Sequence, residues 1–144
     1  MGVIKTPIIH RVLIHASREN VFDAMTTEEG LDSWFTSGST VALQEKGEII
    51  FRWKNWGPDK VNEEALGTIV EIKRPERFVF QWWLDQPTTV EMDFIETTSG
   101  TIVELRESGY LDTIEGHERC LSCATGWGEA LTLLKFYVEH GIIY

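Results

Sequence analysis

The chain has 144 residues, which fits one domain large enough to bury its own hydrophobic core. Its formal net charge of −10 argues against nucleic acid and anionic membrane surfaces as partners, because a negative field repels phosphate groups. No apolar run is long enough for membrane insertion, and the first residues lack a signal peptide's apolar stretch, so we expect one cytoplasmic domain over residues 1–144.

The N-terminal quarter of the chain predicts one strand followed by two short helices. Residues 8–15 are rich in β-branched side chains and alternate loosely, which is typical of a strand. Ser17 stands where the N-cap of a first helix belongs. Thr27 and the two glutamates after it favour a second helix start, because acidic side chains stabilise a helix N-terminus, and this helix ends near Trp34.

The middle of the chain predicts a run of strands with short connections. The expected strands are 39–43, 47–53, 64–73, 77–84, 88–97 and 101–108. Short connections between successive strands imply antiparallel pairing. Alternation gives each of the longer strands one apolar face: Ile49, Phe51 and Trp53; Phe78, Phe80, Trp82 and Leu84; Val90, Met92 and Phe94; and Val103 and Leu105, with Glu107 next in the same register.

Residues 116–141 read as one long amphipathic helix closed by a glycine. Apolar side chains recur three or four residues apart and therefore form one stripe: Cys120, Cys123, Ala124, Trp127, Leu131, Leu134 and Val138. This stripe is what can cover the apolar faces of the strands. The helix either packs flush on the sheet or leaves a hollow, and that choice decides the function.

The order and spacing of several short segments resemble one protein family. The matching segments are Ser17 with Val21-Phe22, Trp34-Phe35, residues 67–72, residues 75–82, residues 101–105, Gly109, Gly126-Trp127, and Leu131 with Leu134-Lys135. Together they resemble the AHSA-type proteins, which are homologues of the activator of heat-shock protein 90 ATPase in the START-like (SRPBCC) superfamily. The resemblance implies an α+β helix-grip fold like that of the birch-pollen allergen. In it a curved antiparallel sheet of six or seven strands, with two short helices after strand one, wraps a long C-terminal helix.

The resemblance also implies three classes of function. Members of the superfamily hold lipids or other hydrophobic molecules between sheet and helix, so the first expectation is binding of a small hydrophobic or aromatic ligand without a cofactor. Some members are cyclases or dehydratases, so the second is an enzyme that uses a polar group of the pocket. The third is stimulation of a heat-shock protein ATPase in a stress response, which is known for eukaryotic relatives with an additional N-terminal domain.

The aromatic residues are the first candidates for a binding site. The chain has six Trp, seven Phe and three Tyr, more than a flush small core usually needs. Ligand pockets are mostly apolar with few polar anchors. The expected lining residues are Trp34, Phe51, Trp53, Phe80, Trp82, Met92, Leu105, Trp127 and Leu131. The alternative is that these rings fill the interior themselves.

Glu107 and His117 are the candidates for catalysis. Glu107 has the register of an inward-facing residue, and a carboxylate in an apolar cavity could serve as a general acid or base. Solvation, or an ion pair with Arg52 or Arg106, is the alternative for it. His117 stands beside the expected helix start, where it faces either the cavity mouth or solvent.

The remaining reactive residues predict no metal or redox site. Cys120 and Cys123 form a CxxC without the further ligands that zinc requires, so we expect buried, reduced thiols. The four histidines match no metal-binding pattern. A homodimer through the sheet edges or the loop at Trp56 is left open by the sequence.

Overall fold

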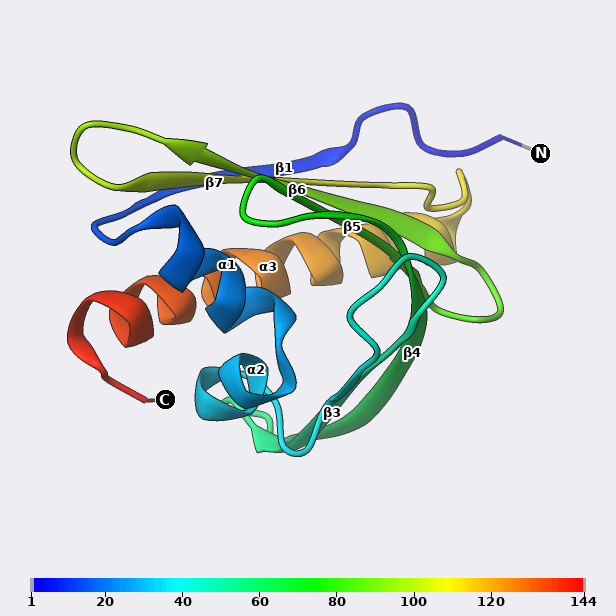
Figure 1. The fold of residues 1–144 in the computed structure, drawn as a ribbon. Helices are drawn as coiled ribbons and strands as arrows, with labels where there is room; N and C mark the ends of the chain where they lie inside the picture. The colour runs from blue at the N-terminus through cyan, green and yellow to red at the C-terminus, as the bar shows by residue number, and fades with distance from the viewer. Residues whose placement is uncertain (1, 144) are drawn as a thin grey trace.

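A computed structural model describes residues 2–143 and shows a seven-stranded antiparallel sheet that curves around one long helix (Figure 1). The elements are β1 (Ile8–Ile14), α1 (Arg18–Thr26), α2 (Glu28–Trp34), β2 (Thr40–Val41), β3 (Glu48–Trp56), β4 (Val61–Lys73), β5 (Arg77–Trp82), β6 (Thr88–Glu96), β7 (Thr101–Ser108) and α3 (Ile114–His140). The strand order is β1-β7-β6-β5-β4-β3-β2. Each strand from β2 to β7 therefore pairs with its neighbours in the chain, whereas β1 pairs with β7, the last strand. The expected helix-grip architecture is confirmed.

Side-chain caps define where each helix begins. The Ser17 hydroxyl accepts a hydrogen bond from the backbone of Asn20 at the start of α1. Thr27 joins two helices, because its backbone N–H bonds to Asp23 while its hydroxyl accepts the N–H of Gly30 in α2. Gly141 ends α3 in the left-handed conformation, with φ of 68°, which glycine adopts without steric cost.

Two irregularities bend the sheet around the helix. The register shifts between Ile69 and Glu71 where β4 pairs with β5, and between Trp53 and Trp56 where β3 pairs with β4. Such bulges increase strand twist and curvature. Gly67 allows a close approach at the same bend, because a Cβ there would lie 2.2 Å from the Gln81 carbonyl oxygen. As a result β4 and β3 arc away from β1 and β7 and around the interior (Figure 1).

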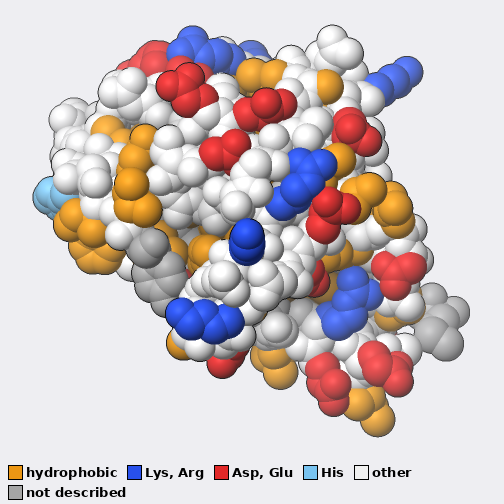
Figure 2. Space-filling model, turned by 90° about the horizontal axis from the view of Figure 1, so that it is seen from below, with side chains coloured by type: hydrophobic (Ala, Val, Ile, Leu, Met, Phe, Trp, Pro, Cys, Tyr) orange, Lys and Arg blue, Asp and Glu red, His pale blue; other side chains and the backbone are white. Residues whose placement is uncertain are grey.

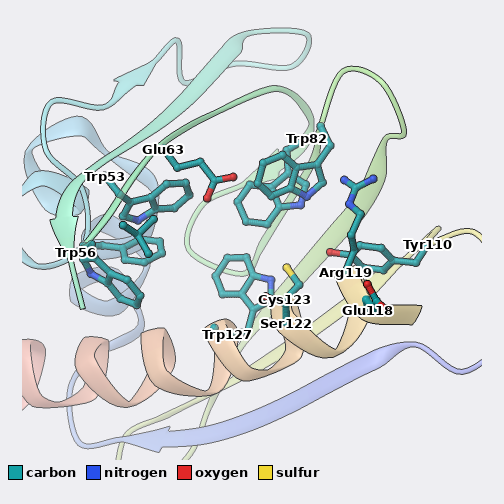
Figure 3. Close-up of a pocket in the computed structure, with 14 residues that line it drawn as sticks. Trp53, Trp56, Glu63, Trp82, Tyr110, Glu118, Arg119, Ser122, Cys123 and Trp127 are labelled. Atoms are coloured by element: carbon teal, nitrogen blue, oxygen red, sulfur yellow. The ribbon is translucent and has the colours of Figure 1, made fainter. Parts of the chain in front are cut away.

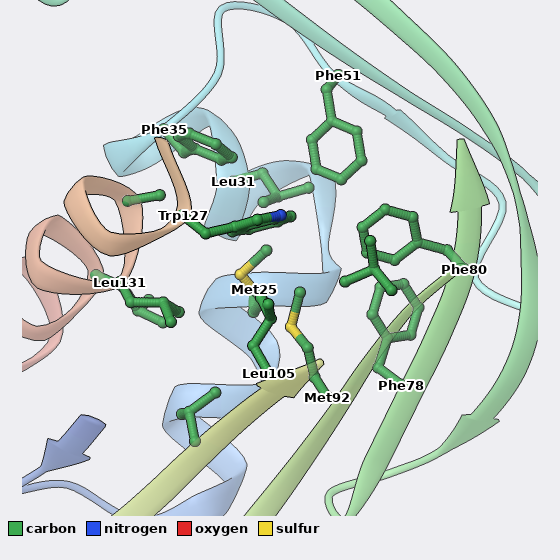
Figure 4. Close-up of a cluster of buried hydrophobic side chains, with 14 of the residues drawn as sticks. Met25, Leu31, Phe35, Phe51, Phe78, Phe80, Met92, Leu105, Trp127 and Leu131 are labelled. Carbon is green, nitrogen blue, oxygen red and sulfur yellow. The ribbon is translucent and has the colours of Figure 1, made fainter. Parts of the chain in front are cut away.

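Aromatic and aliphatic side chains fill the centre between sheet and helices (Figure 4). Phe22 of α1 packs edge-on against Phe94 at 5.0 Å between ring centroids. The largest fully buried side chains come from the sheet and the short helices: Phe22, Phe51, Phe78, Phe80, Phe94, Ile14, Met25, Leu31, Ile49, Ile69, Met92 and Leu105. Each contributes on the order of 1.5–3 kcal/mol by burial. The side chains in the middle of the domain are therefore shielded from solvent and packed against one another.

Several expected boundaries differ from the structure. The strand expected over residues 39–43 is only Thr40–Val41, and β3 runs on to Trp56 instead of ending at Trp53. Leu84 does not share the buried face of β5: the strand ends at Trp82, and Leu84 is 77% exposed. The cause is the backbone of Trp83, whose φ of 69° breaks the alternation of the strand.

Candidate functional site

A pocket of about 520 Å³ opens between the first half of α3 and the end of the sheet formed by β3, β4 and β5 (Figure 3). Helix α3 contributes residues on one face, spaced three or four apart: Glu118, Arg119, Ser122, Cys123, Gly126 and Trp127. The other walls are Phe35, Trp53, Trp56, Val61, Glu63, Trp82, Trp83 and Tyr110. A pocket of this size fits a drug-sized molecule.

Indole rings form most of the wall, because five of the six tryptophans line the pocket. The Trp82 ring lies 5.4 Å from that of Trp127 and 6.5 Å from that of Trp53, measured between centroids. Trp127 and Trp82 are almost fully buried, while Trp53 and Trp56 are half-buried. The aromatic surface therefore continues from the core out to the pocket mouth.

The backbone at Trp83 explains how two consecutive residues share one pocket. Neighbouring residues of a regular strand point to opposite faces of the sheet. The left-handed conformation of Trp83 turns its ring to the side of Trp82, with 4.8 Å between the two centroids. This conformation is unfavourable for a bulky residue. The fold thus maintains a strained residue at the pocket, which is where such residues tend to cluster.

Glu107 lies behind the inner wall of the pocket and accepts hydrogen bonds from the side chains that form this wall. Its side chain is fully buried and accepts hydrogen bonds from five side chains. One oxygen accepts from Trp127 Nε1 at 2.8 Å and Cys123 Sγ at 3.2 Å. The other oxygen accepts from Trp82 Nε1 at 2.9 Å, Thr88 Oγ1 at 2.5 Å and Tyr110 Oη at 2.9 Å. Four of these donors line the pocket, so one carboxylate fixes their orientation.

The donors around Glu107 are held in their neutral forms. Burial, followed by the charges of Cys123 and Glu107, raises the pKa of Tyr110 far above its usual range. Burial, followed by the negative charge of Glu107, likewise raises the pKa of the Cys123 thiol. The pKa of Cys120 is raised by the same two causes. Both cysteines are free thiols and half-buried, and a thiol with a raised pKa is a poor nucleophile.

Charged side chains occupy two places in the pocket. The Glu63 carboxylate points into it between the rings of Trp53 and Trp82 (Figure 3), and within residues 2–143 it makes no hydrogen bond or ion pair. Arg119 lies at the Tyr110 end, with its guanidinium 5.9 Å from the centroids of both Trp83 and Tyr110. Its Nη1 donates to Gln86 at 3.0 Å.

The structure separates the nine residues expected around a ligand into three groups. Trp53, Trp82 and Trp127 line the pocket. Trp34 is buried, donates its indole N–H to Ala24 and touches a second, more polar hollow near the end of α2. The other five lie in the solid core: Phe51, Phe80, Met92, Leu105 and Leu131.

The two candidates for catalysis lie in different surroundings. Glu107 points inward as its register predicts, but the alternatives of solvation or pairing with Arg52 or Arg106 are wrong, because it is buried among neutral donors and Arg52 pairs with Glu64. Its oxygens are occupied, and it does not line the pocket. His117 is exposed, and its Nε2 lies 2.8 Å from Asp112 Oδ1 at the surface.

Sequence reasoning missed several residues that line the pocket. Trp56 and Glu63 lie outside the expected strands 47–53 and 64–73, and none of the expected apolar faces includes Trp83. Tyr110 and Arg119 carried a usable signal. Arg119 directly precedes Cys120, the first residue of the apolar stripe. Glu118, Ser122 and Gly126 are four residues apart, which predicts that they form a second row on the helix next to that stripe.

The outer surface carries charges of both signs. Acidic and basic side chains are interspersed with hydrophobic ones on the face shown in Figure 2. In the part of the chain that the structure describes, no helix is long and apolar enough to cross a membrane. Within residues 2–143, no three His, Cys, Asp or Glu side chains gather as metal ligands would.

Comparisons with known proteins agree with this architecture. The family described as activator of Hsp90 ATPase homolog 1-like proteins matches residues 15–139. Among curated proteins, none gives a significant match. The solution structure of the Aha1 dimer from Colwellia psychrerythraea is 25% identical, covers 94% of this chain and 98% of that one, and has a TM-score of 0.78.

Two further structures share the fold at lower identity. Protein SSP2350 from Staphylococcus saprophyticus is 24% identical, covers 96% of both chains and has a TM-score of 0.77. DynU16, from the dynemicin biosynthetic locus, is 13% identical with a TM-score of 0.80, and the match covers 96% of this chain but 49% of that one. At these identities the likeness concerns the fold alone.

Proposed function

This chain belongs to the activator of Hsp90 ATPase homolog 1-like family, and from that premise we propose that it is a binding protein for a small, largely aromatic molecule. The observation that carries the proposal is the pocket of about 520 Å³ whose walls contain five indole rings. The family fold supports ligand binding in general, and the pocket supplies the chemistry that would select a flat apolar guest.

The rigidity of the inner wall supports binding rather than catalysis. Glu107 fixes Trp82, Trp127, Tyr110 and Cys123 before any ligand arrives. Preformed walls reduce the entropy that a ligand must overcome on binding. The same hydrogen bonds occupy both oxygens of Glu107, so the carboxylate acts on the pocket through its neighbours.

Gly126 offers a direct test of the pocket as a binding site. A Cβ at this helical position would meet no atom within 4 Å, because the space beside it is the pocket. Gly126→Leu should therefore occupy the pocket. It should not unfold the protein, since glycine is about 1 kcal/mol less favourable than leucine inside a helix.

We expect the neutral fluorescent probe N-phenyl-1-naphthylamine to bind the wild-type protein saturably, and Gly126→Leu to weaken that binding by at least about tenfold. The matched control is Thr125→Leu, the next residue of α3, which is exposed and outside the pocket. It should bind the probe like the wild type. Equal probe affinity in Gly126→Leu and wild type would refute the proposal, provided that thermal unfolding shows both to be folded.

A further inference from the structure

We infer that the pocket selects an organic cation, with an ammonium-type group held beside Glu63 among the indole rings. The inference rests on the proposed function and names the class of ligand. It follows from three observations about the pocket. The Glu63 carboxylate has no ion-pair partner within the described residues, aromatic rings surround it, and at the opposite end the positive charge of Arg119 lies near the negative charge of Glu118.

Glu63 is an exposed carboxylate at the edge of the pocket, at the end away from Arg119. It lies on β4 opposite Trp53 of β3, and the bulge between Trp53 and Trp56 bends the two strands around it. Its neighbour Glu64 points to the other side of β4 and forms an ion pair with Arg52 at 2.9 Å. Glu63 has no such partner within the described residues, although it borders a pocket whose walls are mostly apolar. A carboxylate in that setting favours a ligand that brings a positive charge.

The rings around Glu63 suit a cation as well. Indole faces carry negative potential and attract ammonium groups within about 6 Å of the ring centroid. Trp53, Trp82 and Trp127 lie around the Glu63 carboxylate (Figure 3). The same preference already operates in this pocket, because Trp83 and Tyr110 bind the guanidinium of Arg119.

The Arg119 end of the pocket gives no comparable attraction for an anion. Arg119 is held by Gln86 and by the two rings, so an incoming anion would compete with contacts that exist. Glu118 lines the same end and offsets its charge (Figure 3). The net charge of −10 adds a long-range field that attracts cations.

Three isosteric probes separate charge from shape: benzyltrimethylammonium, neutral neopentylbenzene and anionic phenylmethanesulfonate. Each carries one phenyl ring and one compact, three-branched head. Affinities can be measured by quenching of tryptophan fluorescence. We expect the cation to bind at least about tenfold more tightly than the neutral probe, and the anion to bind most weakly. Raising the salt concentration should weaken binding of the cation alone.

The variant that tests the role of Glu63 is Glu63→Gln. It should remove the preference for the cation and leave the affinity for neopentylbenzene within about twofold. The matched control is Glu64→Gln, which changes the net charge equally on the opposite side of the strand and should keep the preference. Equal loss in both variants would mean that only the overall field matters, and would overturn the inference.

The remaining outcomes distinguish this inference from the proposed function. If the cation and the neutral probe bind equally well, or the anion binds best, the inference fails while the proposed function stands. A different result would refute both proposals. If none of the three probes binds, and Gly126→Leu binds N-phenyl-1-naphthylamine as the wild type does, the proposed function fails and the inference fails with it.

Discussion

At the scale of single residues, Glu107 is a buried carboxylate that accepts hydrogen bonds from five side chains. A buried carboxylate without a cation usually destabilises a protein unless donors surround it. Here two indole N–H groups, two hydroxyls and a thiol provide those donors. Glu107 of β7 therefore specifies how β5, β6, β7 and α3 meet, which an apolar residue of the same size would not do.

Glu107→Gln should be strongly destabilising. Both oxygens of Glu107 accept hydrogen bonds from donors, so the NH₂ group of glutamine would face N–H, O–H or S–H groups in either orientation and would make no hydrogen bond with them. We expect a loss of roughly 3 kcal/mol in the free energy of unfolding, measured by urea denaturation. Glu104→Gln on the same strand is the control: its ion pair with Arg11 is at the surface, and such pairs contribute about 1 kcal/mol or less. Similar midpoints for the two variants would contradict the role assigned to Glu107.

The same residue shows how far sequence reasoning reaches. Alternation along 101–108 predicts that Glu107 faces inward with Val103 and Leu105, and all three are fully buried. Its partners Trp82 and Trp127 could not be predicted, because they lie 25 and 20 residues away in the chain and only the folded structure brings them to Glu107. Register gives the direction of a side chain, whereas its contacts depend on distant parts of the chain.

At the scale of elements, regular segments follow from sequence better than irregular ones. The stripe on α3 predicts which side of the helix packs, and Trp127, Leu131 and Leu134 are buried. The pocket instead arises where regularity fails, at the bulge between Trp53 and Trp56 and at the left-handed Trp83. Periodic patterns carry no signal for such breaks, so the expected lining extended along the sheet to Phe51, Phe80 and Met92, whereas the pocket lies at the end of the sheet marked by Trp53 and Trp82.

The junction of α1 and α2 depends on one threonine. The Thr27 hydroxyl donates to the Asp23 carbonyl at 2.7 Å and accepts from the Gly30 N–H at 2.9 Å. Thr27→Ala should lower the free energy of unfolding by about 1–2 kcal/mol through loss of the N-cap, whereas Thr27→Ser should retain most of it. Thermal unfolding of the two variants checks this, and an alanine variant as stable as the serine variant would show that the cap is not needed.

At the scale of the whole molecule, the two ends of the interior differ in how closely their side chains pack. The half near α1 is packed solid around Phe22, Phe78 and Phe94. The half near the start of α3 keeps open space beside Trp127 and Gly126. Stability supplied by the packed half allows the other half to keep polar and strained groups at the pocket.

That division predicts a loss of stability in alkaline solution. Cys123 and Tyr110 keep their protons in the folded protein because their pKa values are raised. The unfolded chain releases them near pH 8.5 and pH 10 respectively, as ordinary thiols and phenols do. Above those values the unfolded state binds fewer protons than the folded state, so the free energy of unfolding falls as the pH rises. Below about pH 8 neither group ionises in either state, and their stabilisation is fully present.

The expected slope is up to about 1.4 kcal/mol per pH unit for each group that ionises only on unfolding. Urea denaturation at a series of pH values between about 7 and 11 measures it. In Cys123→Ala the decline between about pH 8.5 and pH 10 should be shallower than in the wild type, because Cys120 is then the one of these two thiols that still ionises on unfolding. If the variant and the wild type lose stability in parallel from pH 8.5, the thiol is not held protonated beside Glu107, and the hydrogen-bond cluster that orients the pocket wall must be revised.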